Sequence, residues 1–191
     1  MDLIEKAVSV LSRDGIVIYP TETVYGLGAD AFSEDAILKV YAAKKRPLAQ
    51  PISIAVAGFE MLCAVAFVEP SQEEFLQAFL PGPVTVVLRA KHSVPGILTG
   101  GTGLIGIRIP AHERALQLIE RFDSPITATS ANLHGAKEPA TPDECTVPRD
   151  LFIDGGRLPG VPSTVVDLTT MTVLRQGASA DRIQKYLSGS G

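Results

Sequence analysis

The chain has 191 residues, of which 46% are hydrophobic and 20% charged, and its formal net charge is −4. This length and composition predict one folded domain and exclude a disordered chain. The acidic balance also argues against a protein that coats nucleic acids without sequence preference.

The spacing of apolar residues predicts helices that alternate with short strands. In chain order we expect helix 3–13, strand 16–19, helix 33–44, strand 52–56, helices 58–66 and 71–79, strand 84–88, strand 107–110, helix 111–122, strand 126–129, strands 151–153, 164–168 and 172–174, and helix 180–187. Residues 20–30 and the glycine-rich stretch 96–106 are expected to be loops. The polar, proline-containing segment 133–149 is expected to be a mobile loop, and residues 188–191 a frayed tail.

The alternation of elements predicts a single α/β (α+β) domain over residues 1–191, with its core at about 3–187. The last three strands follow one another too closely for helical crossovers. We therefore expect one large mixed sheet rather than a wholly parallel one.

Several kinds of site are excluded. Cys63 and Cys145 cannot build a disulfide framework, which favours a reducing cytoplasm, and no histidines have the spacing of zinc ligands. No long apolar run predicts a membrane span, and the first residues lack the pattern of a signal peptide. Residues 101–106 match G-x-G-x-x-G, but a strand pattern follows them instead of a helix, so a flexible glycine loop is favoured over a dinucleotide site.

Basic side chains lie beside the ends of predicted strands and helices. Lys44, Arg46, Arg108 and Arg175 each follow or end an apolar element. Arginine matches the paired oxygens of carboxylates and phosphates, and lysine adds a compact charge. Because open sheets place ligands at strand ends, this pattern predicts a pocket for an anionic small molecule such as a nucleoside triphosphate.

Each of these residues also has a purely structural interpretation. Lys44 and Arg46 could be solvated side chains that stabilise the C-terminal end of a helix. Asn132 could bond the backbone of its own turn. The hydroxyls of Thr23 and Ser163 could cap a turn or a strand edge. Spacing alone does not decide between these alternatives.

Taken together, the polar motifs resemble the YrdC/TsaC family of threonylcarbamoyl-AMP synthases, in its short, single-domain form. The most specific motif is Pro20-Thr-Glu-Thr-Val-Tyr-Gly-Leu27. The others follow in the family's order: Lys44-x-Arg46, Pro81-Gly-Pro-x-Thr85, Arg108-x-Pro110, Ser130-Ala-Asn132 and Ser163-Thr-Val-Val-Asp167. The likeness spans Gly15 to about Gly177. It implies a twisted mixed parallel/antiparallel sheet flanked by helices, with a large concave cleft.

The resemblance implies a nucleotidyltransferase, L-threonylcarbamoyladenylate synthase. This enzyme forms threonylcarbamoyl-AMP and pyrophosphate from L-threonine, bicarbonate and ATP, for the t6A37 modification of tRNA. Downstream threonylcarbamoyl-transferase proteins would use the product, and tRNA or double-stranded RNA would be a further partner. Mg²⁺ would be held mainly through ATP, with no metal ligands from the protein.

The resemblance also implies roles for particular residues. Lys44 and Arg46 would grip the ATP phosphates and act in catalysis. The remaining ATP-binding residues would be Gln50, Ser130, Asn132 and Arg175. L-Threonine would be bound by Thr23, Arg108 and Ser163. The sequence departs from the family pattern at Glu22, where many relatives have Asp, at Gln50, where Asn is usual, and at Ala55, where some have His.

Two other functions remain as alternatives. A double-stranded RNA or tRNA-binding module without catalysis would need a basic surface, and the net charge argues against high affinity. A carbamoyl-transfer domain like that of hydrogenase-maturation proteins would be accompanied by zinc-finger-like and acylphosphatase-like segments, which the sequence lacks.

Overall fold

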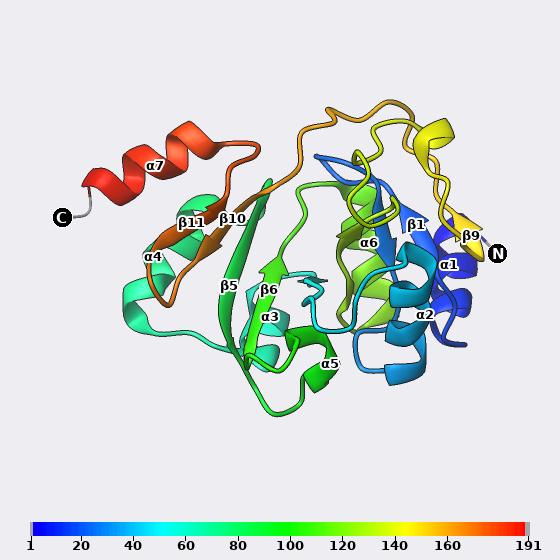
Figure 1. Ribbon diagram of the computed structural model, residues 1–191, viewed down its shortest axis with the longest axis horizontal. Helices are drawn as coiled ribbons and strands as arrows, with labels where there is room; N and C mark the ends of the chain where they lie inside the picture. Colours follow the sequence, from blue (N-terminus) through cyan, green and yellow to red (C-terminus); the bar gives the residue numbers. More distant parts are fainter. Residues whose placement is uncertain (1, 190–191) are drawn as a thin grey trace.

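The computed structural model describes residues 2–189 (Figure 1). Within this part of the chain, the larger of two sheets has seven strands, in the order β11-β10-β5-β6-β3-β7, with β4 paired to β5 outside this row. These strands are β3 (Ile54–Ala55), β4 (Ala66–Phe67), β5 (Val84–Ala90), β6 (Leu104–Arg108), β7 (Ile126–Thr127), β10 (Thr164–Asp167) and β11 (Thr172–Arg175). β10 runs parallel to β5, and β3 runs parallel to β6, whereas the other neighbours are antiparallel. The predicted mixed character is confirmed.

The smaller sheet has the order β8-β2-β1-β9. Its strands are β1 (Val17–Tyr19), β2 (Gly26–Gly28), β8 (Thr129–Ser130) and β9 (Leu151–Phe152). The prediction of one large sheet is therefore wrong. The chain passes from β7 in one sheet to β8 in the other at Ala128, whose N–H donates to the carbonyl of Ser53.

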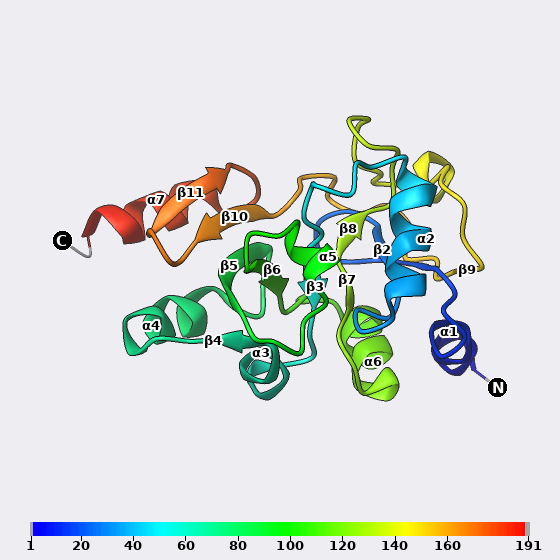
Figure 2. The ribbon, with the colours of Figure 1, turned by 60° about the horizontal axis from the view of Figure 1, so that its bottom comes forward.

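Helices cover both sheets (Figure 2). They are α1 (Leu3–Leu11), α2 (Glu34–Lys44), α3 (Phe59–Val65), α4 (Pro70–Phe79), α5 (Gly96–Thr99), α6 (Glu113–Phe122), the 3₁₀ turn η1 (Pro142–Glu144) and α7 (Ala180–Gly189). Two helix starts follow from local capping. Asp2 and Glu5 form a capping box at α1, and the Ser33 hydroxyl accepts from the backbone N–H of Ala36 at α2. None of the helices in residues 2–189 is long and apolar enough to cross a membrane.

Two apolar clusters hold these layers together. The larger lies between the sheets and the helices that cover them. The smaller packs α1 and α6 against β1, through side chains such as Leu11, Leu118 and Tyr19. Together they fix β1 and the segment that follows it, which carries the most specific sequence motif.

The three predicted loops all contain regular structure: β2 lies within 20–30, α5 within 96–106 and η1 within 133–149. Residues 20–30 include β2, which sequence periodicity missed because glycine provides no apolar pattern. A Cβ atom on Gly26 would lie 2.8 Å from the ring of Tyr19, so only glycine lets the strand lie against that ring. The stretch 96–106 begins with the short helix α5.

The prediction of a mobile loop over 133–149 is largely wrong. Ala140, Cys145 and Val147 are buried, and the carbonyl of Pro139 accepts from the N–H of Tyr25. Residues 133–137 are exposed in an unbroken run, whereas the exposed residues after Pro139 alternate with buried ones. In the tail, residues 188–189 continue α7 instead of fraying, and residues 190–191 lie outside the described part.

Candidate functional site

A cavity of about 530 Å³ opens where β6 ends and where β5 and β10 begin. It also reaches the C-terminal end of α2 and the end of β8 in the smaller sheet. The predicted site residues that line it are Lys44, Arg46, Arg108, Ser130, Asn132, Ser163 and Arg175. Thr23 and Gln50 are not among the lining residues. The fold therefore gathers most of the predicted site around one hollow.

Arg108 lies on the cavity wall in an ion pair with Glu22. Its Nη2 atom lies 2.6 Å from Glu22 Oε1, and the two side chains are only 7% and 16% exposed. Arg108 Nε and Glu22 Oε2 are both buried without a hydrogen-bond partner. The carboxylate thus fixes one edge of the guanidinium and leaves other donors for a ligand. In the sequence, Glu22 stands out only as a departure from the family pattern.

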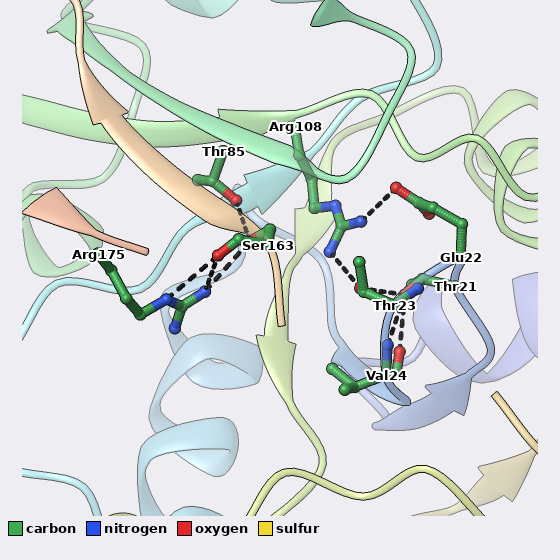
Figure 3. A network of polar contacts seen from close by, with 8 residues as sticks. All are labelled: Thr21, Glu22, Thr23, Val24, Thr85, Arg108, Ser163 and Arg175. Carbon is green, nitrogen blue, oxygen red and sulfur yellow. Dashed lines mark hydrogen bonds and ion pairs between the residues drawn. The ribbon is translucent and has the colours of Figure 1, made fainter. Parts of the chain in front are cut away.

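Thr23 is hydrogen-bonded to the guanidinium of Arg108 (Figure 3). The Thr21 hydroxyl donates to the carbonyl of Val24, at 2.7 Å, so it accepts the hydrogen bond from the Thr23 hydroxyl, at 2.8 Å. Thr23 Oγ1 in turn accepts from Arg108 Nη1, at 3.3 Å. Thr23 is 1% exposed. In this geometry it orients Arg108, and its direct contact with an amino acid stays a prediction.

Ser163 lies between two arginines (Figure 3). Its hydroxyl is 2.8 Å from the hydroxyl of Thr85, and it accepts from Arg175 Nη2 at 3.1 Å. Arg175 also donates from Nε and Nη2 to the Ser163 carbonyl. In Figure 3, Arg108 lies on the other side of Ser163 from Arg175, and both arginines line the cavity. Two positive groups therefore flank one hydroxyl, which suits a ligand that carries negative charge.

Lys44 joins α2 to the end of β8. The residue is 2% exposed, and Nζ donates to the carbonyls of Ser130 and Asn132 and to Asn132 Oδ1. Burial, and then the nearby charge of Arg46, lowers the pKa of Lys44 to about 8. The ammonium group is therefore present at neutral pH, and it positions the strand end as well as adding charge to the cavity.

Asn132 bonds the backbone of its own turn, as its structural interpretation predicted, and it also lines the cavity. Its Nδ2 atom donates to the carbonyls of Leu133, at 3.0 Å, and Ala136, at 2.6 Å. The amide therefore closes the turn that follows β8. Gln50 uses its backbone carbonyl to accept from Arg46 Nε and from the hydroxyl of Tyr41. Its predicted role at ATP stays a prediction.

Arg46 is anchored by its neighbours at the rim of the cavity. Nη2 donates to the carbonyl of Pro51, at 2.9 Å, and Nη1 lies 3.3 Å from Nδ1 of His134. Burial lowers the pKa of Arg46, although a guanidinium remains charged at neutral pH. His134 and Glu138 also line the cavity, although neither was predicted from the sequence. The only signal for them was their closeness to Asn132 in the chain.

Comparison with known proteins gives one consistent family. The family model Sua5_yciO_yrdC, described as "Telomere recombination", matches residues 9–177. The threonylcarbamoyl-AMP synthase of Pyrococcus abyssi is 42% identical over 187 residues, which cover 92% of this chain and 54% of that protein. The chain thus spans about half the length of this curated relative. The Shigella boydii protein of the same name is 33% identical over 185 residues, covering 92% of this chain and 96% of that protein.

A solved structure has the same fold. The crystal structure of P. abyssi Sua5 complexed with L-threonine has a TM-score of 0.88 and 38% sequence identity. The match covers 94% of this chain and 56% of that one. The family resemblance predicted from the ordered motifs, and the fold that it implied, are confirmed.

Proposed function

Because the chain belongs to the Sua5/YciO/YrdC family, we propose that it makes L-threonylcarbamoyl-AMP and pyrophosphate from L-threonine, bicarbonate and ATP. One observation carries this proposal. A single cavity places Arg108 and Ser163, which suit a carboxylate, beside Lys44, Arg46 and Arg175, which suit a polyphosphate. Two anions held side by side in this way can react with each other.

The substrates supply the reacting atoms. Threonine nitrogen and bicarbonate give an N-carboxylate with loss of water, and an oxygen of this carboxylate attacks the α-phosphorus of ATP. The bond from that phosphorus to the pyrophosphate oxygen breaks, and pyrophosphate leaves. Arg108 would hold the threonine carboxylate, while Arg46 and Arg175 would neutralise charge that develops on the phosphates. No nucleophile from the protein is required.

A Mg²⁺ ion carried by ATP is part of the proposal. Mg²⁺ prefers oxygen ligands and is commonly held through substrate phosphates with one or two carboxylates. Among the described residues that line the cavity, Glu138 is the only carboxylate. The residues therefore fit an ion that arrives with the nucleotide better than one held in a protein cage. The ion would supply further neutralisation of the leaving pyrophosphate.

The product is an activated mixed anhydride, so its threonylcarbamoyl group can pass to a nucleophile such as an amino group, with AMP as the leaving group. We assign this transfer to a separate threonylcarbamoyl-transferase in the cytoplasm, which would use it to form t6A at position 37 of tRNA. The test is pyrophosphate release from the purified chain with L-threonine, bicarbonate and ATP, each omitted in turn. Release that depends on all three supports the proposal. Salt-dependent tRNA binding without pyrophosphate release would support the RNA-binding alternative instead.

Replacing Arg46 with alanine should lower kcat/KM for ATP by roughly 10- to 100-fold, because a charged donor at the phosphate subsite is lost. The free energy of unfolding should fall by only about 1 kcal/mol, since Arg46 lies at the rim and mainly donates to carbonyls. Arg13→Ala makes the same charge change at an exposed position outside the cavity and serves as the control. Equal ATP turnover in the two variants would contradict the assignment of Arg46.

Replacing Thr23 with valine should raise the KM for L-threonine about 10-fold with a smaller change in kcat. The variant keeps the shape of the side chain but removes the acceptor that orients Arg108 Nη1. A buried donor left without its partner costs about 1–3 kcal/mol. Thr23→Ser retains the hydroxyl and should stay close to the wild-type protein. An unchanged KM in the valine variant would exclude a role for Thr23 in binding threonine.

A further inference from the structure

Residues 133–138 form a flap over one side of the cavity. Residues 134–138 all line the cavity. The base of the flap is fixed, because the N–H of His134 donates to the carbonyl of Lys44, at 2.9 Å, and the Asn132 amide holds the carbonyls of Leu133 and Ala136. Gly135 has a φ of +79°, which favours glycine in this turn. The turn thus presents the exposed imidazole of His134 from a well-supported backbone.

The donor and the acceptor of the hydrogen bond between Arg46 and His134 can be assigned. Arginine only donates, so Nδ1 of His134 accepts the hydrogen bond from Nη1 and carries no proton in this contact. A neutral imidazole then carries its proton on Nε2, and no protein group accepts from it among the described residues. Each terminal nitrogen of Arg46 also keeps a second N–H after its single bond. The pair therefore offers several unused donors at the cavity.

The charges around the cavity favour an anion at this pair. Arg108 already has the carboxylate of Glu22 as its partner. Glu138 exerts an electrostatic effect on both Lys44 and Arg175. Arg46, by contrast, has no carboxylate partner in the described chain. An incoming anion would meet the least compensated positive charge of the cavity beside His134.

We propose that His134 is a further nucleotide-binding residue, which orients Arg46 through Nδ1 and donates from Nε2 to a phosphate of ATP. This inference rests on the proposed function and adds to it a residue that lies outside the predicted site. The imidazole plays both a positioning and a binding role. A phosphate that bridges Nε2 of His134 and the free N–H groups of Arg46 would be held by charge-assisted hydrogen bonds, which are stronger than neutral ones.

The experiment titrates MgATP, and separately L-threonine, into the wild-type protein and three variants. His134→Ala should weaken ATP binding about 5- to 20-fold and change threonine binding less than about twofold, because a phosphate contact is lost on one side of the cavity only. His134→Gln keeps an amide donor at the end of the side chain and should recover part of the ATP affinity. His92→Ala removes an exposed histidine outside the cavity and should match the wild-type protein.

Nitrogen NMR of the histidine rings gives a second readout that a structural role would not produce. Without ligand, His134 should show protonated Nε2 and unprotonated Nδ1, and MgATP should shift the Nε2 signal. If the wild-type protein binds ATP and His134→Ala binds it equally well, this inference is wrong but the proposed function stands. The same holds if MgATP leaves the Nε2 signal of the wild-type protein unchanged. A wild-type protein that binds no ATP would overturn the proposed function as well.

Discussion

Replacing Arg108 with alanine is expected to abolish threonine-dependent pyrophosphate release and to destabilise the fold. The variant leaves the Glu22 carboxylate, which is 16% exposed, without its positive partner. Breaking a buried ion pair by removing one side costs about 3–5 kcal/mol. The cavity also loses the donor that we propose for the threonine carboxylate, and we expect this loss to lower kcat/KM for threonine by roughly 100-fold or more. Urea unfolding and the pyrophosphate assay measure the two effects.

A double variant separates stability from function. Adding Glu22→Gln to Arg108→Ala removes the unpaired charge, so the free energy of unfolding should recover by most of the lost amount. Activity should not recover, since the guanidinium is still absent. Full stability in Arg108→Ala alone would show that the ion pair does not form in solution. Threonine-dependent release at the wild-type rate would show that Arg108 does not bind the substrate.

Replacing Gly177 with alanine is expected to damage the site from outside the cavity. A Cβ atom there would collide with the carbonyl of Pro162 and would lie 2.7 Å from the carbonyl of Ser163. Both contacts are with backbone, which cannot rotate away as a side chain can. Overpacking of this kind costs about 3 kcal/mol. The displaced segment carries the Ser163 hydroxyl, which we propose binds the substrate, and a shift of about 1 Å at such a group is expected to lower activity by roughly 100-fold.

Gly58→Ala is the matched control, because a Cβ atom at Gly58 would have nothing within 4 Å. Gly58 is the N-cap of α3, where alanine is less favourable, so the free energy of unfolding should fall by no more than about 1 kcal/mol. Thermal unfolding and pyrophosphate release of the two alanine variants can be compared directly. If Gly177→Ala behaved like Gly58→Ala, Gly177 would not pack closely against Pro162 and Ser163 in solution.

The sequence was most informative where local physics decides the structure. Helix α2 begins at the predicted cap Ser33 and ends at Lys44, because capping and apolar spacing act over a few neighbouring residues. Strand β2 was not predicted, because its glycines are required by close contact with the ring of Tyr19 in the neighbouring strand and give no apolar pattern. Buried residues such as Cys145 anchor a segment whose composition alone indicated a mobile loop.

The sequence by itself determined the family, the alternation of elements and four of the basic side chains that line the cavity. Only the tertiary structure decided their partners. Arg108 meets Glu22 across 86 residues of chain, and Arg46 meets His134 across 88. Lys44 is buried and donates to the backbone that follows β8. Thr23 accepts from Arg108 and does not line the cavity. Such contacts depend on how sheets and helices pack. The spacing of residues along the chain does not indicate which distant polar groups will be buried together.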